Sequence, residues 1–108
     1  SVKSVGRIEC VQLADVRWIE ASGNYVMLHQ AGRSIMHRTP LGALARRLDP
    51  DSFMQVHRSV IVRVDQLQTL DAAGDGTFRL GLKCGDTVSA SERYGAQIRA
   101  RMGARTRS

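Results

Sequence analysis

VRWIEASGNYVMLHQAGRSIMHR, residues 16–38, is the stretch that decides the predicted fold. Its residues 16–20, 25–30 and 33–38 are rich in β-branched, aromatic and other apolar side chains, as strands are. A turn signal, Ser22-Gly23-Asn24, separates the first two segments, and Ala31-Gly32 is a two-residue hairpin turn before the third. We therefore expect three consecutive short strands joined by tight turns.

The same pattern extends on both sides of this stretch. Glycine-rich turn signals at residues 74–76 and 85–86 cut the remainder into further short pieces. The other expected strands are residues 7–12, 53–56, 60–64, 67–71, 78–83 and 87–90. The predicted fold class is mostly β, with eight or nine short antiparallel strands arranged as hairpins and two short α-helices.

The first expected helix follows Thr39. Thr39 is suited to cap its N-terminus and Pro40 to occupy its first position. Asp49-Pro50 ends it, because a residue before proline disfavours the α region. One apolar face is expected, formed by Leu41, Leu44, Ala45 and Leu48.

The second expected helix opens at Ser91 as its cap and closes at Gly103. Its apolar stripe consists of Tyr94, Ile98 and Met102. Residues 103–108 then form a basic, flexible tail. No repeat or linker divides the chain, so residues 1–108 are expected to form a single domain.

The charge of the chain favours a polyanionic partner. The net charge is +6, and 14 of the 16 basic residues are arginine. Residues 33–63 contain six arginines and two aspartates, and residues 91–108 contain five arginines and one glutamate, so each stretch carries a net charge of +4. A localised excess of this kind is what a nucleic-acid-binding face requires. The preference for arginine over lysine is explained equally well by a GC-rich genome.

No catalytic or metal-binding pattern is present. The spacing of His29, His37 and His57 is not that of metal ligands. A catalytic triad could be composed of Ser59, His57 and Asp65, but nothing in their spacing supports it. We therefore expect no enzyme, no cofactor and no metal. The two cysteines, Cys10 and Cys84, have no C-x-x-C spacing, so they are expected to be buried free thiols, with a disulfide between them as the alternative.

The expected location is the cytoplasm. No apolar run approaches the ~20 residues that span a bilayer, and Ser1-Val2-Lys3-Ser4 does not open a signal peptide. A parent protein carrying sensor or membrane segments remains compatible with this expectation.

Three positions combine a suitable side chain with a place at an element junction. Arg58 lies at a corner between strands, Arg93 in the first turn of the last helix, and Asn24 in a turn beside Gly23. Arginine can pair two-pronged with guanine and asparagine with adenine. For each residue alone a solvated surface group is the favoured interpretation, and their shared position at element junctions is what favours a binding role. The few aromatic residues favour duplex DNA over single strands or RNA, and Trp18 and Phe53 are expected in the core.

Four segments together resemble the LytTR DNA-binding domain of bacterial transcription regulators. VRWIEASGNYV (16–26) is similar to its I-x-x-I-E-x-x-G-N-Y-V opening, and RTPLGAL (38–44) to its capped helix. FMQVHRSVIV (53–62) is similar to its F-x-x-[IV]-H-R-S core, and VSASERY (88–94) to its closing motif. This chain departs from the pattern at Arg63, where the family has asparagine, and at Glu92, where it often has a basic residue.

The resemblance implies an elongated β-β-β sandwich that acts as the output module of a response regulator in a two-component system. It implies loops that enter successive major grooves of double-stranded DNA, with two modules on direct repeats and a possible homodimer on the DNA. By position, base reading would fall to Arg58, Arg93 and the Gly23-Asn24 turn. Backbone contact or support would fall to Ser91, Arg38, Thr39, His57 and Ser59. The alternative is a basic protein-interaction module whose strand edges accept a partner.

Overall fold

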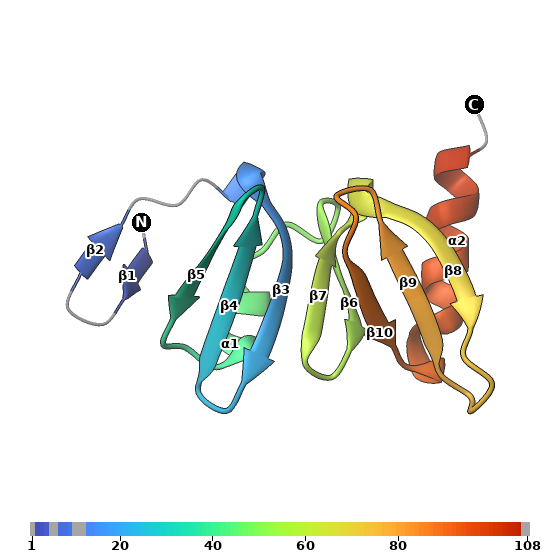
Figure 1. The fold of residues 1–108 in the computed structure, drawn as a ribbon, viewed down its shortest axis with the longest axis horizontal. Helices are drawn as coiled ribbons and strands as arrows, with labels where there is room; N and C mark the ends of the chain where they lie inside the picture. Colours follow the sequence, from blue (N-terminus) through green and yellow to red (C-terminus); the bar gives the residue numbers. More distant parts are fainter. Residues whose placement is uncertain (1, 5–6, 10–12, 107–108) are drawn as a thin grey trace.

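The computed structural model describes residues 2–4, 7–9 and 13–106 and shows an elongated, mostly β domain of 42 × 31 × 25 Å (Figure 1). The expected fold class is confirmed. The strands of the described residues are β1 (Val2–Ser4), β2 (Arg7–Glu9), β3 (Val16–Ser22), β4 (Tyr25–Gln30), β5 (Arg33–His37), β6 (Phe53–His57), β7 (Val60–Arg63), β8 (Leu67–Ala72), β9 (Phe78–Leu82) and β10 (Thr87–Ala90).

These strands form three antiparallel groups. A five-stranded sheet has the order β5-β4-β3-β7-β6, a three-stranded sheet has the order β10-β9-β8, and β1 pairs with β2. The two larger sheets lie side by side along the long axis of the molecule (Figure 1). The helices are α1 (Leu41–Ala45) and α2 (Gly95–Thr106), with 3-10 turns η1 (Leu13–Asp15), η2 (Val64–Gln66) and η3 (Glu92–Tyr94).

Strand β7 joins two hydrophobic cores. Val60 and Val62 pack in the core that α2 covers, whereas Ile61 between them packs in the core that α1 covers. A strand buried on both faces needs a continuous apolar run, because successive side chains point to opposite faces. This explains the uninterrupted Val-Ile-Val of the sequence and places β7 at the centre of the molecule.

The tight turns of the opening stretch form as predicted. Ser22 pairs with Tyr25 across a two-residue turn in which Gly23 has a φ of +61°. A positive φ at the first turn position is typical of a type II′ turn, which suits the twist of a hairpin and favours glycine. The β3–β4 turn therefore projects Asn24 from a position that the backbone fixes.

Neither predicted helix cap makes a side-chain hydrogen bond to the start of its helix. Pro40, not Thr39, is the N-cap of α1, and no side chain bonds to the helix start there. Proline at this position has extended backbone (φ −66°, ψ 146°), so the helix begins one residue later than predicted. Ser91 does lie at the N-cap of η3, but its hydroxyl makes no cap hydrogen bond.

The ends of several elements also differ from the prediction. Helix α2 continues through Gly103 to Thr106, so the predicted stop was wrong; residues 107–108 of the predicted tail lie outside the described residues. A helical glycine costs about 1 kcal/mol relative to alanine, which is too little to end a helix. The predicted strand at 7–12 is observed as β2, while residues 10–12 lie outside the described residues.

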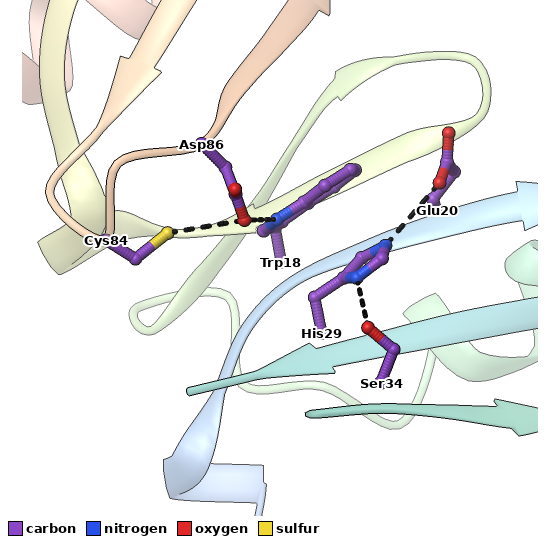
Figure 2. A network of polar contacts seen from close by, with 6 residues as sticks. All are labelled: Trp18, Glu20, His29, Ser34, Cys84 and Asp86. Carbon is purple, nitrogen blue, oxygen red and sulfur yellow. Dashed lines mark hydrogen bonds and ion pairs between the residues drawn. The ribbon is translucent and has the colours of Figure 1, made fainter. Parts of the chain in front are cut away.

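Trp18 connects the two larger sheets instead of lying fully in a core. It is half-buried on β3, and its indole Nε1–H donates to Oδ2 of Asp86, 2.9 Å away in the β9–β10 turn (Figure 2). Its ring stacks on His29 of β4 with ring centroids 4.0 Å apart. Phe53, in contrast, is buried as predicted. The polar edge of the indole explains the position of Trp18 at the seam between the sheets.

Candidate nucleic-acid interface

Three junctions that carry the predicted site residues lie along one long edge of the molecule, the lower edge in Figure 1. The β3–β4 turn approaches the β6–β7 turn, since the N–H of Ala21 donates to the carbonyl of Ser59 at 2.8 Å. The β10–η3 junction approaches β6, since the N–H of Ser91 donates to the carbonyl of Val56 at 2.9 Å. The junctions thus form a row, with the β6–β7 turn in the middle.

Side chains of the hairpin brace the middle turn. The N–H of Ser59 donates to Nδ1 of His57 at 3.2 Å, and the Ser59 hydroxyl lies 3.0 Å from the same nitrogen. Because Nδ1 accepts, the ring proton belongs on Nε2. The amide nitrogen of Gln55 donates to the carbonyls of His57 (3.1 Å) and Arg58 (3.4 Å). The backbone on both sides of Arg58 is therefore held in place.

Arg58 itself is exposed at the tip of this braced turn. A register irregularity between Gln55 and His57 marks a bulge in β6 just before the tip. Bulges increase local twist and redirect the residues that follow. The structure thus presents one exposed cationic side chain on a turn whose backbone is held by hydrogen bonds.

Arg93 is also exposed, on the 3-10 turn η3 that precedes α2. Its guanidinium carbon lies 5.5 Å from the ring centroid of Tyr94, a cation–π distance. Half-buried Ser91 fixes the start of this turn through its backbone, as the carbonyl of Ser91 accepts from the N–H of Tyr94 at 3.0 Å. Glu92 is exposed beside Arg93 and offsets part of its charge.

At the other end of the row, Asn24 is exposed on the β3–β4 turn. Arg38 directly follows β5, is exposed, and has its guanidinium carbon 5.9 Å from the ring centroid of Tyr25. The structure therefore brings Arg38 to the turn that carries Gly23 and Asn24. Thr39 is half-buried behind it.

Not all arginines of the two basic stretches serve this face. Arg63 donates through Nε to the carbonyl of Val16 at 2.7 Å and through Nη2 to the carbonyl of Leu13. Arg101 donates to the carbonyls of Pro50 and Asp51. Arg99 lies over the ring of Phe78 at 4.9 Å. Counting charges along the sequence therefore overestimates the cations available to a polyanion.

Gln55 is the structural contributor that sequence reasoning missed. A polar residue between Phe53 and Val56 of a mostly apolar strand was the available signal. Its two acceptors are backbone carbonyls of the turn, and a sequence does not show such contacts.

The structure does not bring Ser59, His57 and Asp65 together as a triad. Ser59 and Asp65 lie beyond opposite ends of β7, in the β6–β7 turn and in η2 (Figure 1). Within residues 2–4, 7–9 and 13–106 there is no group of three metal-ligating side chains. Cys84 is a free thiol as predicted, but it is exposed and not buried, because it lies in the β9–β10 turn; Cys10 is outside the described residues. None of the described helices has both the length and the apolar character needed to cross a bilayer.

The described residues thus form a mostly β domain that presents exposed arginines and an asparagine from turns along one edge, an arrangement suited to contact a polyanion. The chain belongs to the LytTR family: the profile of the LytTr DNA-binding domain matches residues 6–103. This is a DNA-binding family and not an enzyme family. A solved LytTr DNA-binding domain from Bacillus cereus has the same fold, with a TM-score of 0.78, 25% identity and 94% of each chain covered.

Two curated regulators are similar in sequence. The CO-responsive transcriptional regulator RcoM of Rhodospirillum rubrum is 46% identical over 54 residues, which are 50% of this chain and 23% of that protein. The positive alginate biosynthesis regulatory protein of Pseudomonas aeruginosa is 31% identical over 97 residues, which are 88% of this chain and 39% of that protein. The chain thus spans less than half the length of either relative.

Proposed function

We propose that this domain binds specific double-stranded DNA sequences as the output module of a bacterial transcription regulator in the cytoplasm. The observation that carries the proposal is the row of three linked junctions, with an exposed arginine on a braced turn at its centre. Loops held by a rigid scaffold are where binding residues concentrate. Similarity to a CO-responsive transcriptional regulator and to a positive regulatory protein of alginate biosynthesis supports the same proposal.

In this proposal Arg58 and Arg93 read base edges in the major groove. The planar guanidinium can donate two parallel hydrogen bonds to guanine, and a fixed backbone lowers the entropy lost in forming them. Asn24, on the turn shaped by Gly23, has the donor and acceptor pair that matches adenine. The arrangement in a row suits contact along one duplex.

The remaining residues position the domain on the phosphate backbone or support the readers. Arg38, Thr39 and Ser91 lie beside the outer turns and are proposed as phosphate contacts. His57 and Ser59 bond to one another and are proposed as supports for Arg58. Binding of two modules to direct repeats, as a homodimer on DNA, completes the proposal and follows from the family resemblance alone.

Anisotropy titration against genomic fragments and random duplex, with Arg58→Ala and Arg93→Ala beside the wild type, tests the proposal. We expect at least one fragment to bind more tightly than random duplex. Each substitution should cost about 1–3 kcal/mol on that fragment. Equal affinity of the wild type for all duplexes would refute sequence-specific binding.

The basic protein-interaction module remains the competing function. It predicts salt-sensitive binding to an acidic protein and no affinity for duplex DNA even at low salt. The same titration would reveal the absence of duplex affinity.

A further inference from the structure

A polar hollow lies along the edge of the molecule opposite the three junctions. Its volume is about 460 Å³, and Arg17 of β3, Gln66 of η2, Lys83 and Asp86 of the β9–β10 turn and the β4–β5 turn line it. These elements meet along the upper edge in Figure 1. Hollows of this size accommodate small ligands.

Arg17 is the unusual residue of this hollow. Its Nε is fully buried and has no hydrogen-bond partner among the described residues. A buried donor on a charged group that lacks an acceptor is costly, so buried polar groups are nearly always paired in folded proteins. Arg63, on the neighbouring strand β7, shows the ordinary arrangement, with two backbone carbonyls as acceptors. An acceptor supplied from outside the chain would satisfy Arg17.

The other polar groups of the hollow are also suited to donate. Gln66 is only 5% exposed, and its amide oxygen accepts from the N–H of Cys84 at 3.0 Å. That bond occupies the oxygen and leaves the amide NH₂ as the group suited to bond a ligand. Lys83 adds an ammonium from the exposed rim.

Asp86 is the acidic residue that lines the hollow, and its carboxylate already has partners. Oδ2 accepts from the indole of Trp18 at 2.9 Å and lies 3.7 Å from Sγ of Cys84 (Figure 2). Two cations and one carboxylate leave a formal net charge of +1 among the lining residues. This balance suits one negative charge better than two.

We infer that the hollow is a binding site for a carboxylate, held by the guanidinium of Arg17 with Gln66 and Lys83 as further donors. A carboxylate matches the planar guanidinium in a two-pronged arrangement and carries the single charge that the lining residues balance. The bound group would bridge β3 of one sheet and the β9–β10 turn of the other. This inference is independent of DNA binding, because it concerns the opposite edge of the molecule.

Titration of the ¹⁵N-labelled chain with acetate, followed by NMR at constant ionic strength, tests the inference. We expect saturable shifts of the Arg17 Nε–H signal and of the Gly32 and Lys83 amides. Arg17→Gln should weaken binding at least about tenfold, since a hydrogen bond to a charged group is lost. Lys83 lies in an exposed turn, so Lys83→Gln should not disturb folding. It should weaken acetate binding about two- to fivefold. Arg79 is an exposed residue of β9 that does not line the hollow, so Arg79→Gln is the matched control and should leave acetate binding unchanged.

Two further probes distinguish the source of the carboxylate. An acetylated, amidated Gly-Glu-Gly peptide that saturates the same signals below the acetate range would assign the group to a protein side chain. Acetate saturating first would assign it to a small metabolite. The inference would be overturned by any of three results. The shifts could be linear and reproduced by chloride, inorganic phosphate could bind more tightly than acetate, or Arg17→Gln and Lys83→Gln could both leave the affinity unchanged.

Discussion

The tip and the base of the β6–β7 hairpin each carry an arginine, and the two arginines have opposite environments. At the tip, Arg58 is exposed while Gln55 and His57 hold only the backbone around it. At the base, the side chain of Arg63 is half-buried, bonds to two carbonyls and lies 4.4 Å from the ring centroid of Phe53. One arginine is free to meet a ligand, and the other is part of the fold.

This difference shows that a charged side chain is available to a ligand only where the fold does not already use it. Arg63 occupies the position where the family pattern has asparagine. Its long side chain reaches the carbonyls of Leu13 and Val16, so it ties β7 to the start of β3. The departure from the pattern therefore has a structural explanation in this chain.

The largest expected effect is on stability, at the base of the hairpin. Arg63→Ala removes charge-assisted hydrogen bonds to two carbonyls and a cation–π contact, and we expect a loss of about 3 kcal/mol in the free energy of unfolding. Urea denaturation of both proteins measures it. Arg58→Ala is the matched control, and a surface substitution of this kind should stay within about 0.5 kcal/mol of the wild type. Equal destabilisation by the two substitutions would remove the distinction between tip and base.

A smaller effect is expected from the brace beneath Arg58. Gln55→Leu keeps the size of the side chain but removes the donor to the carbonyls of His57 and Arg58. We expect specific DNA affinity to fall by about 1 kcal/mol, because the reader is less well positioned. Non-specific affinity and its salt slope should not change, since no phosphate contact is lost.

Combining this substitution with Arg58→Ala gives the corresponding control. If Gln55 acts through Arg58, the double variant should bind no more weakly than Arg58→Ala alone. Additive losses would show that Gln55 acts in another way.

At the seam between the two larger sheets, the expected change in free energy is similar to that of Gln55→Leu or smaller. Trp18→Phe removes the indole donor to Asp86 and retains a ring beside His29. We expect a loss of about 1 kcal/mol in stability, the usual contribution of one hydrogen bond. Asp86→Ala should produce a comparable loss, and the double variant should show less than the sum. Strict additivity in this cycle would indicate that the bond across the seam does not stabilise the domain.

The smallest effect concerns the β8–β9 turn. Hydrogen bonds from the hydroxyl and then the N–H of Thr77 lower the pKa of Asp75 below its ordinary value. A carboxyl with a lowered folded-state pKa contributes stability that is present above its unfolded pKa and is lost as the pH falls through the folded value. Asp75→Asn should therefore narrow the stability difference between neutral and acidic pH. An unchanged acid-side profile would contradict this account.

Local sequence signals predicted the strands and turns well, and contacts between distant residues explain what they missed. Gly23 and Gly32 marked hairpin turns that the structure forms, because turn geometry depends on the residues in the turn. The role of Arg63 depends on carbonyls about fifty residues away in the chain, and that of Gln55 on the backbone of a folded turn. The gathering of Gly23, Arg58 and Ser91 along one edge likewise follows from the sheet order, which local patterns do not encode.

The most direct test of the central claim is binding of wild type and Arg58→Ala to a specific duplex substituted one base pair at a time. The account predicts that the wild type discriminates at one guanine by about 1–3 kcal/mol and that Arg58→Ala loses discrimination at that position only. A uniform loss of affinity across all substituted duplexes, with a reduced salt slope, would instead assign Arg58 to a phosphate contact and contradict the account.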